Sequence, residues 1–234
     1  MHDVSDVSLM AALQLADSFF PSGTLTLSHG LEAFLSLHPE SGKDIPRLLE
    51  DYLQHKVAPL ELVAYLHAYR AAETADLEQL QHIDCYLTAS LLPQELRQGS
   101  ARSGRALLET LRPLEHLEHD ALFQAFATGV RTQQSEGNAP ICLALVCLNW
   151  QVPQRTGGIV LLYTFMVSFL GAALRLGSIG HREAQRILLS LRPQLSSLLD
   201  MVWERDLDEM GAFAPLADIR AMQHTYLPVR LFSS

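Results

Sequence analysis

Lysine is nearly absent from this chain of 234 residues, no run of Lys and Arg occurs in it, and its formal net charge is -9. Proteins that bind nucleic acids neutralise phosphates with clustered basic side chains. The composition therefore argues against a nucleic-acid partner. Cysteine is also scarce. Because Cys85, Cys142 and Cys147 are an odd number and two of them lie in apolar runs, we expect reduced core residues rather than disulfides.

The motifs of common enzymes are missing as well. The sequence has no phosphate-binding G-x-x-x-x-G-K-[ST] loop and no dinucleotide fingerprint. Residues 177–180 (GSIG) have the wrong spacing for a nucleophile elbow and predict a helix C-cap and turn. His116 and His119 are a weak candidate for metal ligation, because no H-E-x-x-H or C-x-x-C pattern accompanies them. We therefore expect no catalytic residue, no resident metal and no stably bound cofactor.

The amino terminus lacks the features of a secretory signal. Residues 1–10 contain Asp3 and Asp6 and no Lys or Arg, whereas a signal begins with basic residues and continues with an unbroken apolar stretch. We therefore expect a cytoplasmic protein.

One stretch, residues 158–174, has no charged residue and is close to the lower limit of about 17 residues for a membrane span. Polar and small residues such as Ser168 and Gly171 interrupt it, and no positively charged loop flanks it. A central helix of an all-helical domain is apolar on every side for the same reason. We expect a buried helix and no membrane association.

Apolar residues recur at the spacing of a helix throughout most of the chain. In residues 45–57 they recur every three or four positions, with Asp44 placed to cap the helix, Pro46 in its first turn and Pro59 expected to end it. The same pattern predicts further helices at residues 8–18, 29–37, 60–73, 76–91, 94–111, 119–135, 139–150, 155–175, 181–192, 194–206 and, shorter, 215–223. Strand signals are almost absent and connections are short. We predict an all-α, single-domain bundle of about ten helices that spans residues 1–234.

The C-terminal tail, residues 224–234 (HTYLPVRLFSS), is unusually apolar for the end of a chain. It places Tyr226, Leu231 and Phe232 around a single Arg230, whereas chain ends are normally polar and frayed. Docking of the tail on its own domain and docking on a partner both fit this composition.

Residues 17–32, which begin at Asp17, predict a helix, a tight turn and a second, capped helix. Pro21 and Gly23 supply the turn dihedrals, Ser28 can cap the second helix, and Glu32 is close enough to reach back to its start. An architectural corner accounts for each of these residues.

Arg97, Arg102 and Arg105 lie on one predicted helix among small residues. They can bind an acidic partner, or they can form a solvated face over an internal helix contact. The sequence leaves both interpretations open.

Four segments, in order, resemble those of the UreF family of urease accessory proteins. Residues 17–32 are similar to its amino-terminal signature, 97–108 to its arginine and glycine segment, 172–188 to its helical hairpin, and 228–234 to its terminal R-L-F-x-S. The family-motif positions on this resemblance are Asp17, Pro21, Gly23, Ser28, Gly30, Glu32, Arg102, Gly104, Arg175, Gly180 and Gln185, and the partner-binding tail residues are Tyr226, Arg230, Leu231, Phe232 and Ser234. Ser233 departs from the family, which usually has a second arginine there.

The resemblance implies an all-α homodimer that assembles with UreD (also called UreH) and the GTPase UreG into a complex that loads nickel into apo-urease. On this view the complex handles the nickel, and the chain is a non-catalytic scaffold whose tail docks on UreD.

Two alternatives to a scaffold remain open. The first is activation of the GTPase by an inserted arginine, with Arg102, Arg105, Arg175 and Arg230 as candidates. The second is a nickel carrier. A related hypothesis, passage of nickel through the chain, predicts that polar residues such as Glu32 and Ser28 line an interior path.

Overall fold

The computed structural model describes residues 5–21, 26–37, 44–113 and 115–233. These residues form helices and short connections, and none of them lies in a strand. The helices are α1 (Asp6–Ala16), α2 (Leu31–Leu37), α3 (Ile45–Tyr52), the π-helix η3 (Leu53–Leu62), α4 (Val63–Glu73), α5 (Leu77–Ser90), α6 (Gln94–Leu111), α7 (Glu115–Glu118), α8 (Ala121–Arg131), α9 (Ala139–Asn149), α10 (Gln154–Arg175), α11 (His181–Val202), the 3-10 helix η4 (Leu207–Glu209) and α12 (Pro215–His224). The predicted all-α fold class is confirmed.

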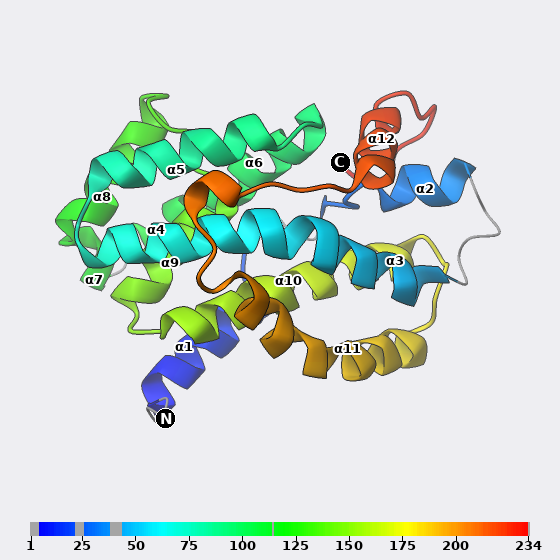
Figure 1. Cartoon of the computed structure of the whole chain (residues 1–234), viewed down its shortest axis with the longest axis horizontal. Coiled ribbons are helices and arrows are strands. Elements are labelled where there is room, and N and C mark those ends of the chain that lie inside the picture. Colours follow the sequence, from blue (N-terminus) through cyan, green and yellow to red (C-terminus); the bar gives the residue numbers. More distant parts are fainter. Residues whose placement is uncertain (1–4, 22–25, 38–43, 114, 234) are drawn as a thin grey trace.

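The helix α10 occupies the middle of the bundle (Figure 1). It packs against α1, α9, α11 and η3, while α4 packs on α5 and α9, and α6 covers α9. The C-terminal helix α12 contacts α2 and α6 at the opposite end of the molecule from α1. In Figure 1, α1 lies at the lower left of the bundle and α12 at the upper right.

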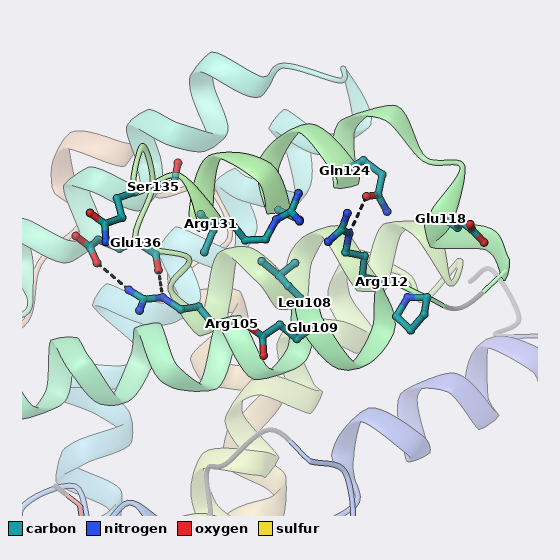
Figure 2. Close-up of a pocket in the computed structure, with 13 residues that line it drawn as sticks. Arg105, Leu108, Glu109, Arg112, Glu118, Gln124, Arg131, Ser135 and Glu136 are labelled. Atoms are coloured by element: carbon teal, nitrogen blue, oxygen red, sulfur yellow. Dashed lines mark hydrogen bonds and ion pairs between the residues drawn. The ribbon is translucent and has the colours of Figure 1, made fainter.

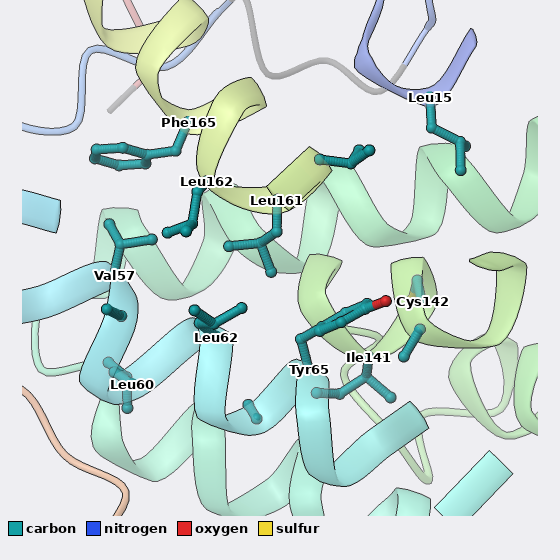
Figure 3. Close-up of a cluster of buried hydrophobic side chains, with 14 of the residues drawn as sticks. Leu15, Val57, Leu60, Leu62, Tyr65, Ile141, Cys142, Leu161, Leu162 and Phe165 are labelled. Atoms are coloured by element: carbon teal, nitrogen blue, oxygen red, sulfur yellow. The ribbon is translucent and has the colours of Figure 1, made fainter. Parts of the chain in front are cut away.

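The core lies where η3, α4, α9 and α10 meet (Figure 3). Leu62, Tyr65, Ile141, Cys142 and Leu162 are completely buried there. Burial of one large apolar side chain stabilises a fold by about 1.5–3 kcal/mol, so this cluster contributes substantially to the stability of the bundle. The prediction of reduced core cysteines is confirmed for Cys142 and Cys147, which are free and buried, and is wrong for Cys85, which is free but exposed.

The apolar helix α10 is the one described helix that is long and apolar enough to cross a membrane. In its most apolar stretch 67% of the residues are buried inside the protein. The charge-free run therefore forms the predicted buried helix.

Pro59 does not end the helix that precedes it, and the predicted break there is wrong. Instead α3 widens into the π-helix η3, which contains Pro59 and continues directly into α4. Proline has no N–H to offer to the carbonyl four residues earlier, that of His55. The Phe213 amide donates to the His55 oxygen (3.0 Å) and the Gly211 amide to the Pro59 oxygen (3.1 Å). The chain between η4 and α12 thus provides hydrogen bonds that the helix interior lacks.

Pro193 does not divide the last long helix either, although two helices were predicted on its two sides. The helix α11 runs unbroken through it, with Pro193 exposed. Apolar residues on both sides of the proline lie on one buried face, namely Ala184, Ile187, Leu191, Leu195, Leu198, Leu199 and Val202. Burial of this face outweighs the backbone hydrogen bond that proline removes.

Candidate functional site

The four segments that resemble the UreF family are distant in sequence, yet they meet around the C-terminal tail. Glu32 from α2, Arg102 from α6 and Arg175 from α10 each contact one of the last residues of the chain. Figure 1 shows the C-terminus beside α12 and α2. We take this meeting point as the candidate functional site.

Glu32 binds the backbone of the tail. Its side chain is almost fully buried, and its two carboxylate oxygens accept hydrogen bonds from the amides of Leu231 (2.8 Å) and Phe232 (3.2 Å). The sequence predicted that Glu32 reaches back to the start of its own helix. The structure instead connects it to residues about 200 positions later, because the tail crosses the N-terminal end of α2.

Phe232 is the buried anchor of the tail, with 6% of its surface exposed. The guanidinium carbon of Arg175 lies 4.3 Å from the centre of the phenylalanine ring, a favourable cation–π geometry. Beyond it, the Ser233 amide donates to the Thr26 carbonyl (2.9 Å), and Arg102 donates to the Ser233 hydroxyl (3.2 Å). One side of the tail therefore docks on its own domain.

His224, at the end of α12, lies at the centre of this site and is completely buried. Its Nε2 is 2.8 Å from a Glu32 oxygen, and its Nδ1 is 2.7 Å from an oxygen of Glu95 on α6. Arg230 donates to the other oxygen of Glu95 (3.2 Å). Sequence reasoning missed His224 and Glu95, since each is an ordinary polar residue in a helix until the fold brings residues 32, 95 and 224 together.

A second buried ion pair also holds α12. Asp218, one and a half turns before His224, pairs with Lys56 of η3, and both side chains are nearly inaccessible to solvent. This pair was missed as well. The one available signal was Lys56 itself, a lysine in a chain that has almost none, close to a predicted apolar stripe.

In α12 the buried face is the polar one and the exposed face is the apolar one, the reverse of most surface helices. Its buried positions are Ala217, Asp218, Ala221 and His224, which are small or polar. Its exposed positions include large apolar residues at helical spacing, Leu216 (52% exposed), Ile219 (50%) and Met222 (44%), followed by Tyr226 (86%) in the tail. The outer face, defined by these four residues, is thus more apolar than the inner one.

Gly30 allows α12 to approach this closely. It has a positive φ of 81°, and a Cβ at this position would lie 3.0 Å from the Ala221 nitrogen. Both conditions favour glycine. The family-motif position Gly30 is therefore explained by the docking of α12 over the start of α2.

The tail contacts described above involve none of the remaining family-motif positions. Asp17 follows α1 and accepts a hydrogen bond from the Phe19 amide (2.9 Å), Ser28 is fully buried, and Gly104 packs directly on the Gly137 carbonyl, where no Cβ fits. Pro21, Gly180 and Gln185 are exposed. Gly23 and Ser234 lie outside the described residues.

The arginines proposed as GTPase-activating groups all have partners in the protein. Besides the contacts of Arg102, Arg175 and Arg230 at the tail, Arg105 pairs with Glu136 (3.2 Å) on the neighbouring loop. Arg97 donates to the carbonyls of Leu91 and Leu92 at the start of α6. On the inner side of α6, Gly99, Ala101, Ser103 and Gly104 are buried, so the helix packs through its small residues.

A groove of about 1050 Å³ lies between α6 and α8 (Figure 2). Its charged side chains are Arg105, Arg112, Arg131, Glu109, Glu118 and Glu136. Because positive and negative groups are equal in number and Arg105 is already paired, the groove does not select a ligand by its charge. It contains none of the tail contacts.

A smaller pocket of about 130 Å³ lies between α6, α10 and η3. Burial raises the pKa of Glu61 in its lining to about 7, and burial together with Lys56 lowers the pKa of His29 to about 4. Neither Glu32 nor Ser28 is among the lining residues, so the hypothesis of nickel passage gains no support from this pocket.

Within the described part of the chain, no group of three histidine, cysteine or carboxylate side chains is arranged to hold a metal ion. In the cluster of Glu32, His224 and Glu95, the two carboxylates contact opposite nitrogens of the ring. His119 is exposed, and the side chain of His116 lies outside the described residues. Burial also raises the pKa of the Cys147 thiol to about 12, which disfavours the thiolate that would ligate a metal.

Comparison with known proteins gives a consistent result. The model of the UreF family matches residues 40–192. The urease accessory protein UreF of Trichodesmium erythraeum (strain IMS101) is 32% identical over 242 residues, which cover 98% of this chain and 99% of that protein. UreF of Bacillus sp. (strain TB-90) is 27% identical and covers 97% of this chain, and UreF 1 of Brucella melitensis biotype 1 is 29% identical and covers 96%. The similarity therefore includes both the N-terminal and the C-terminal segments of the site.

Proposed function

The chain belongs to the UreF family of urease accessory proteins, and from this premise we propose that it is a non-catalytic scaffold that joins UreD (also called UreH) and the GTPase UreG to apo-urease for GTP-dependent nickel insertion. The observation that carries the proposal is the reversed polarity of α12. Leu216, Ile219, Met222 and Tyr226 form a continuous apolar face on an element that is held to the protein by its small and polar side.

Such a face is suited to a protein partner. Single exposed apolar residues are common, but several at helical spacing on one helix mark an interaction site, and an apolar helix face typically binds in a groove of its partner. Val229 and Leu231 extend the face along the tail, with 75% and 68% of their surfaces exposed. Phe232 is buried and anchors the tail, so the proposed UreD contact uses Tyr226, Val229 and Leu231 instead.

Activation of UreG by an inserted arginine is the alternative role at the same surface. Arg230 is the candidate beside the apolar face, with about half of its side chain exposed (47%) and one hydrogen bond to Glu95. Replacement of Arg230 by Ala separates the two roles. A scaffold residue loses complex formation, whereas an activating residue keeps the complex and loses GTP turnover.

The test of the scaffold role is co-purification with UreD and UreG. Aspartate at both Ile219 and Met222 places charge on the apolar face without a change to the buried side of α12. The control is Leu92→Asp, at a still more exposed leucine (61%) two residues before α6. We expect the double variant to lose the complex and the control to retain it.

Retention of the complex by the folded double variant would contradict the assignment of this face. A mass measurement on the same samples tests the homodimer that we also propose. The proposed compartment is the cytoplasm, and nickel is proposed to be handled by the assembled complex. Equilibrium dialysis of the isolated chain against micromolar nickel tests the carrier alternative.

A further inference from the structure

The contacts of His224 require one particular protonation state. Both ring nitrogens lie within 2.8 Å of carboxylate oxygens, Nε2 near Glu32 and Nδ1 near Glu95. Carboxylates only accept hydrogen bonds, and a neutral imidazole donates from a single nitrogen. With both carboxylates ionised, both contacts are therefore hydrogen bonds only when His224 is an imidazolium.

The charges in this cluster then balance. Glu32 and Glu95 are negative, His224 and Arg230 are positive, and the first three are almost inaccessible to solvent. Loss of the histidine proton leaves an uncompensated negative charge in a buried place and turns a nitrogen lone pair toward a carboxylate oxygen. Both changes are costly, since buried charges without partners are strongly destabilising.

The other charged groups around α12 do not supply the positive charge that His224 loses with its proton. Asp218, on the same helix, is paired with Lys56 of η3. Arg175 of α10 lies over the ring of Phe232, and Arg102 of α6 binds Ser233. These contacts are separate from those of the imidazole.

Apolar packing contributes little to the attachment of α12. Its buried apolar residues are Ala217 and Ala221, which bury far less surface than leucine or phenylalanine. The amides of Leu231 and Phe232 bind to the same carboxylate as His224. The end of α12 and the tail therefore depend on one ionic cluster together with the Phe232 anchor.

We infer that Glu32, His224, Glu95 and Arg230 form a proton-dependent clasp, which holds the end of α12 and the tail on the protein when His224 is charged and releases them when it is neutral. Release removes the ordered arrangement of Tyr226, Val229 and Leu231. The inference goes beyond the proposed function, because it concerns the isolated chain and stands whether or not this surface binds UreD.

The amides of Leu231 and Phe232 report directly on the clasp, since both donate to Glu32. Their hydrogen-exchange protection factors, corrected for the intrinsic pH dependence of exchange, are measured by NMR on the full chain at about pH 6 and about pH 9. We expect protection to fall about tenfold or more at the higher pH. The Trp150 amide, bonded to the Val146 carbonyl in the core, is the internal control and should not change.

Glu95→Gln is the decisive variant. A glutamine can accept from Arg230 with its oxygen and donate with its amide nitrogen to a neutral His224, while His224 donates to Glu32. We expect this variant to retain tail protection at about pH 9, where the wild-type protein loses it. If Glu95 had a purely structural role, the Glu95→Gln variant would instead show weaker tail protection than the wild-type protein at both pH values.

His224→Gln removes the titrating group, and its tail should show little change in protection between the two pH values. Three results would overturn the inference: equal protection of the wild-type tail at both pH values, a parallel loss in Glu95→Gln, or an undiminished pH response in a folded His224→Gln protein. None of these outcomes depends on UreD or UreG, so failure of the clasp and failure of the scaffold proposal are distinguishable.

Discussion

At the scale of single residues, the smaller pocket contains two groups with opposite responses to pH. Burial raises the pKa of Glu61 from 4.5 to about 7, so the folded protein holds this proton more tightly than the unfolded chain does. Stability from this group is complete below pH 4.5 and is lost as the pH rises to about 7. His29, whose pKa falls from 6.5 to about 4, loses stability as the pH decreases through the same interval.

We predict that Glu61→Gln stabilises the protein by an amount on the order of 2 kcal/mol above pH 7, because the variant has no carboxylate to ionise in the pocket. The difference from the wild-type protein should vanish near pH 4. Urea denaturation of both proteins across this range measures it. An equal free energy of unfolding at pH 8 would show that the Glu61 carboxylate is well solvated.

The candidate site shows which residues a sequence reveals and which it does not. Glu32, Arg175 and Arg230 were identified, since each lies in a short segment with its own recognisable pattern. The sequence did not show that these residues lie close together, because the contacts join residues separated by up to about 200 positions. His224 and Glu95 carry no local pattern, and only their burial against each other distinguishes them.

At the scale of elements, helical periodicity and apolar faces were sufficient to predict most helices, including the buried α10 and the short α12. The errors concern proline. At Pro59 and Pro193 the local rule predicts a break, and in each case a non-local interaction outweighs it: hydrogen bonds from residues 211–213 at η3, and a long buried face along α11. A sequence window of a dozen residues contains neither interaction.

This account of α11 predicts that Pro193→Ala stabilises the protein by about 1–3 kcal/mol, because alanine restores an N–H to the helix interior and causes no clash. Pro193 is exposed, so core packing should not change. Thermal and chemical denaturation measure the effect. A loss of stability would instead indicate that the proline sets a bend on which the packing of α11 depends.

At the scale of the whole molecule, the candidate site contributes little to the core. The buried apolar cluster draws on helices throughout the bundle, whereas the tail contributes Phe232 alone to it. The bundle should therefore fold without its last residues. The tail should affect what the protein binds more than whether it folds.

Removal of residues 224–234 is predicted to leave the helical content nearly unchanged and to lower the melting temperature by about 5 °C, as expected for the loss of one or two kcal/mol in a chain of this size. Circular dichroism and calorimetry measure both quantities. The truncated chain should also fail to co-purify with UreD. Broad, non-cooperative unfolding would show that the tail is required for the fold itself.

The contacts between α2, α6 and the tail also determine when the site can form during synthesis of the chain. Glu32 and Glu95 leave the ribosome while His224 and Arg230 have still to be translated, and N-terminal parts of a chain generally fold first. The pairing of the two carboxylates is therefore complete only after residues 224–230 have emerged. A chain terminated before these residues can build the bundle but cannot assemble this surface, so their translation becomes a condition for forming the proposed complex.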